Sequence, residues 1–245
     1  MRGILEVIAG ILAGTVGTAG GITSLVSYPA LLLLGLSPLQ ANIGNIVALV
    51  ACWPSSTLAS RPELKARPPS IGVSVVVSLL SGVAGAVLLI ETPNTYFTEL
   101  VPFLLTLASV TLITQPLIHN RFSETVNGAK RRIFGIGLIL ITVYNGYFGA
   151  GAGIMLLTLD QVTSGDEVAY SNARKNILIG AATLGSAATL VTLRPVAWGA
   201  IAPLSLGLFV GGLLGPKLTR VLPATLLRTL IALLGIGLAA SFWIS

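Results

Sequence analysis

Residues 7–60 form 54 consecutive positions without a charged side chain, interrupted by the glycine-rich stretch 17–21. An apolar run longer than about 18 residues can cross a bilayer as a helix. A second glycine-rich stretch, 149–153, interrupts the other half of the chain. A glycine cluster interrupts the helix and leaves backbone polar groups unpaired, and lipid cannot satisfy these groups. Such breaks are therefore tolerated only where protein or a water-filled cavity covers them.

The composition indicates an integral membrane protein. The chain has 245 residues, of which 54% are hydrophobic and 9% charged, with a mean hydropathy of +0.92, whereas soluble domains carry about 25% charged residues. The net charge of +6 is not taken as a sign of nucleic-acid binding, because most basic residues lie in short loops, where they set membrane orientation. The bilayer is therefore an expected partner and nucleic acid is not.

We expect an all-α, polytopic protein with two homologous transmembrane repeats. Its apolar segments are 4–34, 40–60, 70–90, 97–118, 133–159, 171–193, 196–216 and 224–244. The longest polar stretch, 119–132, separates the halves, so the expected organisation is a first repeat at 1–120, a polar loop at 121–132 and a second repeat at 133–245. Four features recur at offsets of 130–132 residues: Gly17 with Gly149, Asn45 with Asn176, Gly82-x-x-Gly85 with Gly212-x-x-Gly215, and Pro93 with Pro223.

The first segment leaves two topologies open. As one helix, residues 4–34 would be about 46 Å long, too long for one comfortable crossing of a core of about 30 Å and too short for two. If this segment and 133–159 both cross, the chain has eight spans and parallel repeats. If both re-enter, the first as two half-helices of roughly a dozen residues, each half has three crossings and the repeats are inverted. With both termini outside, only Arg2 and Arg194 then lie outside, so the positive-inside rule favours inversion.

The two breaks predict an anion site. A helix that begins inside the membrane presents unpaired N–H groups and the positive end of its dipole, and glycines let an anion approach that backbone closely. Paired breaks in corresponding positions of two halves are the sequence sign of a transporter's substrate site. The alternative is that the glycines only permit close helix packing, and their repetition favours the site.

Polar side chains near the breaks supply the other candidates. Asn45 and Asn176 can donate to an anion or bond between helices, and Arg174 and Lys175 can attract an anion at one entrance or extend into head groups. The candidate substrate-binding residues are Gly17, Thr18, Gly20, Gly21, Thr23, Ser24, Asn45, Tyr144, Asn145, Gly149, Gly151, Gly153, Arg174, Lys175 and Asn176.

Other chemistry finds little support in the sequence. It contains no histidine–cysteine metal cluster, nucleophile triad or phosphate loop, so we expect neither an enzyme nor a cofactor. Glu6 and Asp160 are positions for a coupling proton, although both also suit a membrane interface. Trp53, Trp198 and Trp243 lie toward segment ends, as interfacial anchors do. An oligomer is compatible with this sequence.

The residues resemble the TauE/SafE sulfite exporter family. In the first half the resemblance rests on 17–21, Pro29-Ala30-Leu31, 35–41 and Gly44-Asn45, and in the second on 149–153 and 172–176. It implies a transporter of the bacterial inner membrane that moves sulfur-containing anions, such as sulfite or organosulfonates. It also implies that an ion gradient, expected to be a proton gradient, drives the transport. Alternatives are an uncoupled anion channel and a transporter of a small carboxylate without sulfur.

The chain departs from the family pattern at three places near the expected site. Ala19 and Ala152 stand where the family usually has glycine, and the second half has Leu156–Leu159 in place of a Pro-x-Leu element. These departures leave the expected fold intact and bear on the identity of the substrate.

Overall fold

The computed structural model describes residues 2–67, 69–122 and 127–221. Every regular element in these ranges is a helix, which confirms the all-α prediction. In chain order the helices are α1 (Arg2–Gly20), α2 (Ser24–Leu33), α3 (Pro38–Leu49), α4 (Cys52–Ala59), α5 (Arg61–Ala66), α6 (Gly72–Glu91), α7 (Asn94–Phe122), α8 (Asn127–Tyr147), α9 (Ala152–Ser164), α10 (Val168–Leu193) and α11 (Trp198–Val221). The expected segment 224–244 and Pro223 lie outside the described residues.

Both glycine-rich stretches interrupt helices. The first break separates α1 from α2 at Gly21, and the second separates α8 from α9 between residues 148 and 151. Gly21, Gly149 and Gly151 have φ values of 82°, 81° and 76°, in the left-handed region that glycine adopts without the steric cost a Cβ imposes. The chain therefore turns at these positions because glycine occupies them.

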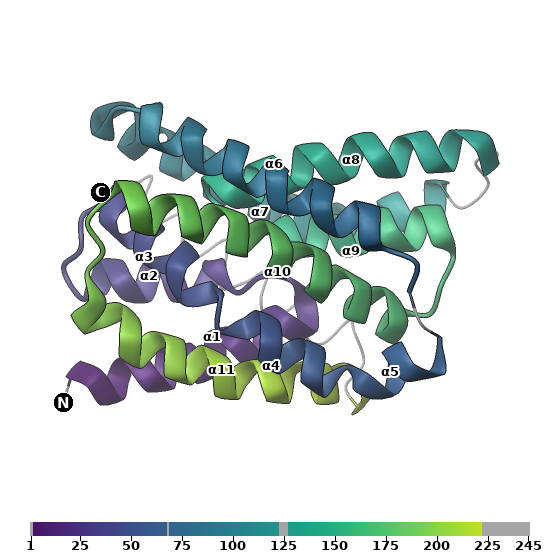
Figure 1. Ribbon diagram of the computed structural model, residues 1–245, viewed down its shortest axis with the longest axis horizontal. Coiled ribbons are helices and arrows are strands. Elements are labelled where there is room, and N and C mark those ends of the chain that lie inside the picture. Colours follow the sequence, from purple (N-terminus) through teal and green to yellow (C-terminus); the bar gives the residue numbers. More distant parts are fainter. Residues whose placement is uncertain (1, 68, 123–126, 222–245) are drawn as a thin grey trace.

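Each broken segment returns to the end of the bundle where it began (Figure 1). Gly3 and Glu6, early in α1, line a common cavity with Leu34 and Leu36, just after α2. At the opposite end, the start of α8 and the end of α9 line another cavity together. The two broken segments thus enter the bundle from opposite ends, as in the inverted arrangement, while the duplication of the two halves itself stays a prediction.

Two glycine seams hold the long helices together. Gly10 and Gly14 of α1 pack directly on the backbone of α11, where Gly207 and Gly211 face them. Close glycine contacts of this kind let helices approach in lipid, where the hydrophobic effect gives little drive for association.

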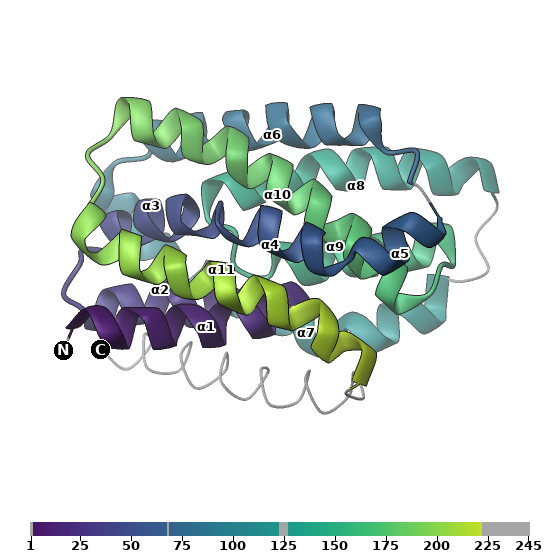
Figure 2. The ribbon, with the colours of Figure 1, turned by 60° about the horizontal axis from the view of Figure 1, so that its bottom comes forward.

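The second seam joins α6 to α8. Gly82 and Gly85 of α6 lie against the α8 backbone at Gly146 and Val143. In both seams, the first helix of one broken segment packs on a long helix from the other half of the chain (Figure 2).

The surface and interior have the polarity expected in a bilayer. Exposed side chains include Val73, Leu80, Leu140 and Leu206, which are 61–80% exposed, whereas Asn42, Asn45 and Ser55 are buried. Four described helices are long and apolar enough to cross a membrane on their own, namely Gly3–Gly20, Gly72–Glu91, Val168–Leu193 and Trp198–Thr219. These features support a multi-pass membrane protein.

Two expectations about helix lengths were wrong. The first broken segment divides unequally, with 19 residues in α1 and 10 in α2, and not into two pieces of about a dozen. The segment expected as one helix over 40–60 is two helices, α3 and α4, with an interruption at Val50 and Ala51. Pro54 explains the interruption, because it has no N–H for the Val50 carbonyl and its ring clashes with that group.

Candidate functional site

The two breaks meet in the interior. The backbone N–H of Ile154, in the first turn of α9, donates to the carbonyl oxygen of Gly21 at 3.1 Å. A methyl group at Gly21 would overlap the backbone of Gly153 and Ile154, and one at Gly153 would overlap Gly21. Glycine on both sides is therefore what allows the break from one half to touch the break from the other.

A cavity lies beside this contact, and we call it the central cavity. The space open to the centres of water molecules is about 50 Å³, enough for roughly four waters. It is lined by Gly17, Thr18, Gly21, Thr23, Ser24, Leu49, Cys52, Trp53, Ser56, Asn145, Gly149, Gly153, Lys175, Asn176, Ile179, Gly180 and Thr183. Both breaks, the α3–α4 interruption and α10 contribute to it.

Lys175 brings a basic group to the central cavity. Lys175 is buried, with 2% of the residue exposed, and its Nζ donates to the carbonyl oxygen of Thr18 at 3.3 Å. That carbonyl is available because α1 ends two residues later. Among the described residues, no carboxylate forms an ion pair with Lys175, and a buried amine of this kind, when it is protonated, favours an anionic partner.

Amides and hydroxyls surround the amine. Asn176 Nδ2 donates to the same Thr18 oxygen at 3.2 Å. Asn145, near the end of α8, donates to Thr183 Oγ1 on α10 at 3.1 Å. Ser24 stands at the start of α2, where the helix dipole favours negative charge. The cavity thus combines one amine with neutral donors, a set suited to a small anion.

Asn45 has the interhelical role that the sequence left open. Its Nδ2 donates to Ser24 Oγ at 3.0 Å, and its Oδ1 accepts from Ser27. These bonds fix α2 against α3 behind the wall of the central cavity. Asn45 and Asn176 therefore occupy different environments, although they correspond in the proposed repeat.

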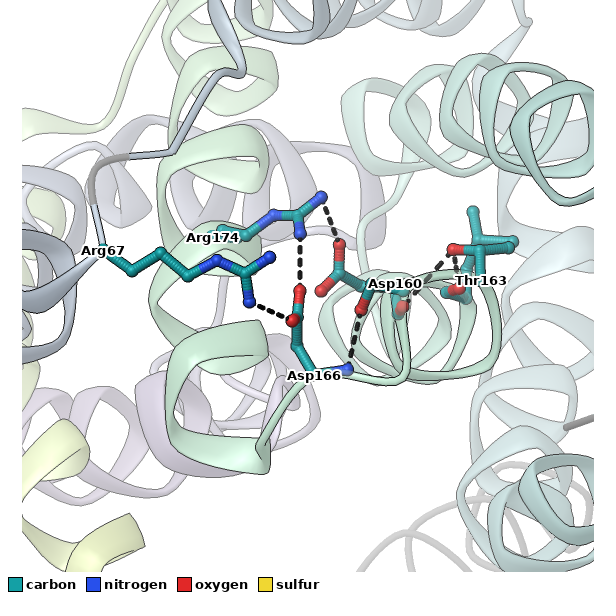
Figure 3. Close-up of polar contacts among 7 residues, drawn as sticks. Arg67, Asp160, Thr163, Asp166 and Arg174 are labelled. Carbon is teal, nitrogen blue, oxygen red and sulfur yellow. Dashed lines mark hydrogen bonds and ion pairs between the residues drawn. The ribbon is translucent and has the colours of Figure 1, made fainter. Parts of the chain in front are cut away.

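Arg174 does not line the central cavity, although it precedes Lys175, which does; Figure 3 shows its side chain beside Asp160 and Asp166. Its guanidinium forms ion pairs with Asp160 and Asp166, each at 3.0 Å, and its Cζ lies 5.8 Å from the centre of the Tyr170 ring. Arg67 also bonds Asp166. Arg174 is thus engaged in an ionic cluster with Asp160, and the sequence offered no means of separating its position from that of Lys175.

The candidate residues therefore fall into two groups. Those that line the central cavity are Gly17, Thr18, Gly21, Thr23, Ser24, Asn145, Gly149, Gly153, Lys175 and Asn176. Those that lie outside its lining are Gly20, Asn45, Tyr144, Gly151 and Arg174. Tyr144 donates its hydroxyl to the Ala150 carbonyl at 2.8 Å across the second break, and Gly151 caps the start of α9, so both shape the break.

Sequence reasoning missed the contribution of α4. Cys52, Trp53 and Ser56 reach the cavity because α3 stops at Leu49 and the chain resumes as a helix at Cys52. Trp53, expected as an interfacial anchor, instead packs on Gly180 of α10, where any Cβ would collide with its indole. Pro54 was the available signal for this interruption.

An all-helical bundle with interrupted helices meeting at a polar central cavity is the architecture of a polytopic membrane transporter. The family model described as "Sulfite exporter TauE/SafE" matches residues 5–242. The chain belongs to this family, as the sequence motifs indicated.

Curated relatives agree with the family assignment. The chain is 24% identical over 242 residues to the probable membrane transporter protein ORF9 of Sinorhizobium sp, covering 95% of this chain and 88% of the relative. It is 22% identical over 248 residues to the probable membrane transporter protein YfcA of Escherichia coli strain K12, covering 98% and 88%. No solved structure matches.

Proposed function

We propose that the protein is a secondary transporter that moves a small sulfur-containing anion, sulfite or an organosulfonate, through the central cavity by alternating access. The observation that carries the proposal is Lys175, a buried amine without a carboxylate partner among the described residues, in a cavity lined by both breaks. A bound anion would compensate its charge and accept hydrogen bonds from the surrounding amides and hydroxyls.

The packing of the bundle suggests which parts move. One group comprises α1 to α4 with α11, and the other α6 with α8, α9 and α10. The glycine seams lie within these groups, whereas the Gly21–Ile154 bond and the central cavity lie between them. Rocking of one group against the other would open the cavity alternately to the two ends while leaving both seams intact.

Glu6 is our candidate for the coupling proton. It is 6% exposed and lines a cavity of about 330 Å³ with Leu34 and Gly199. It makes no ion pair with a described residue, whereas Asp160, the other candidate, is paired with Arg174. A buried carboxyl without a basic partner can take up and release a proton without first breaking an ion pair.

A thermal-shift screen of the purified protein tests the substrate class. Sulfite, thiosulfate and an alkanesulfonate are compared with acetate and chloride, because a ligand that binds only the native state raises its apparent stability. We expect the sulfur oxyanions to stabilise the protein and the controls not to. Stabilisation by acetate alone would favour a carboxylate transporter.

Proteoliposomes distinguish a carrier from a channel. A coupled carrier saturates with substrate and responds to an imposed pH gradient, and the Glu6→Gln variant should lose that response while still binding the anion. A conductance that does not saturate, and that is unaffected by the pH gradient, would identify an uncoupled channel instead.

A further inference from the structure

A second polar cavity opens at the end of the bundle that carries α5, and we call it the basic pocket. It has a volume of about 260 Å³. Its lining comes from three helices: Lys130, Arg131 and Phe134 at the start of α8, Thr163 and Ser164 at the end of α9, and Arg174 on α10. It is separate from the central cavity, with which it shares no lining residue.

Lys130 and Arg131 give this pocket an excess of positive charge. Arg174 already bonds Asp160 and Asp166, so its charge is compensated (Figure 3). No carboxylate in the described part of the chain pairs with Lys130 or Arg131. Two cations without a carboxylate partner among the described residues, lining one cavity, attract a multiply oxygenated anion, and arginine in particular matches the geometry of a phosphate.

A hydroxyl adds a neutral donor. Ser164 Oγ accepts a hydrogen bond from the backbone N–H of Asp166 at 3.1 Å. Within the described ranges its own hydroxyl hydrogen has no acceptor, so it is available to a ligand. The exposed Ser164 therefore completes, with the two basic side chains, a set of donors contributed by two helices.

An apolar track leads away from the pocket along α8. Ile133, Ile136 and Leu140 follow Lys130 at helical spacing and are 42%, 55% and 65% exposed. These positions lie near one another on the helix surface, and Phe134 adds an apolar side chain to the pocket lining itself. A ligand with a charged head and an apolar tail fits this combination better than a free inorganic anion does.

We propose that the basic pocket binds the phosphate head group of an anionic phospholipid whose acyl chains lie along α8. The pocket lies at the end where Arg61, Lys65 and Arg67 also gather, as Figure 1 shows for α5 and the start of α8. The positive-inside rule makes this the cytoplasmic end, and basic pockets between helices on that side are suited to anionic head groups. The lipid would link α8, α9 and α10.

Binding of defined lipids to the full chain tests this site. Protein purified in a neutral detergent is titrated with phosphatidylglycerol, phosphatidylcholine or inorganic phosphate, and native mass spectrometry measures the bound fraction. We expect phosphatidylglycerol to bind more tightly than phosphatidylcholine, and phosphate alone not to compete at equal concentration. Equal affinity for the two lipids, or full competition by phosphate, would overturn the proposal, and the second result would identify a site for free oxyanions.

Charge variants locate the site. The Lys130→Gln/Arg131→Gln variant should bind phosphatidylglycerol roughly 20- to 30-fold more weakly, given the usual contribution of a basic residue near a lipid surface. The matched control is Arg61→Gln/Lys65→Gln, which removes two cations from α5 at the same end and should weaken binding much less, because neither side chain lines the pocket. An equal loss in both variants would indicate diffuse surface charge and overturn the site.

A charge-preserving variant separates lipid recognition from misfolding. Lys130→Arg/Arg131→Lys should retain most of the affinity for phosphatidylglycerol. If this variant loses affinity as fully as the glutamine variant does, recognition does not depend on the two charges and the proposal fails.

Discussion

The carbonyl oxygen of Gly21 accepts a hydrogen bond from the backbone N–H of Ile154, which joins the first helix break to the helix that follows the second. Gly153 lies against the same carbonyl, with no space for a side chain. Residues more than a hundred positions apart in the sequence therefore form one backbone contact in the interior. Because the central cavity borders this contact, its geometry depends on both breaks at once.

Gly153→Ala tests the importance of this contact. The added methyl group would overlap the Gly21 backbone, so we expect destabilisation of about 1–3 kcal/mol and a loss of anion binding. Gly135→Ala in α8 is the matched control, because a Cβ there meets nothing within 4 Å. Thermal melting with and without anion measures both effects. Unchanged binding in Gly153→Ala would show that the contact between the breaks is dispensable.

Lys175→Met tests the charge in the central cavity. The substitution removes the amine that donates to the Thr18 carbonyl oxygen. Because it keeps most of the side-chain volume, the unliganded protein should melt near the parent temperature. Loss of a charged partner for a bound anion should weaken binding by about 2–5 kcal/mol and abolish the anion-dependent thermal shift. Lys217→Met, at an exposed position on α11, is the control and should retain the shift.

The ionic cluster around Arg174 should govern stability rather than binding. Asp160 is buried, with 1% of its side chain exposed, so Arg174→Met leaves a buried carboxylate without its partner and should cost about 3–5 kcal/mol. Asp160→Asn should cost less, because Arg174 keeps Asp166. Arg67→Gln removes a pair whose arginine is 68% exposed and should cost at most about 1 kcal/mol. Chemical denaturation in detergent measures each value.

The orientation of the bundle can be tested with single cysteines in a Cys52→Ser background. Glu91 and Glu167 are exposed at opposite ends, at the end of α6 and just before α10 respectively. With basic loops inside, Glu91→Cys should react with an impermeant reagent in intact cells, and Glu167→Cys only after the membrane is permeabilised. The reverse pattern would place the basic end outside and exclude the proposed topology.

The sequence predicted the helical class and the positions of the glycine breaks, because a glycine cluster in a long apolar run frees backbone groups that must be covered inside the protein. It also identified Lys175 and Asn176 as candidates. It did not separate Arg174 from Lys175, because neighbouring residues on a helix point about 100° apart and only the packing decides which one faces a cavity. The role of Cys52 and Trp53 required recognising Pro54 as a helix interruption inside an otherwise apolar segment.

Cys52 provides the most direct test of a cavity that binds anions and alternates in access. It is the only cysteine in the chain, is 8% exposed and lines the central cavity, so a small alkylating reagent can report on that cavity alone. We expect slow alkylation in the parent protein that an alkanesulfonate slows further, by occupying the cavity. An alkanesulfonate is preferable to sulfite because it does not consume the reagent. In the Lys175→Met variant, protection should disappear while the unprotected rate persists. If the alkanesulfonate leaves the rate in the parent protein unchanged, although it raises the melting temperature, the anion binds elsewhere and the central cavity is not the substrate site.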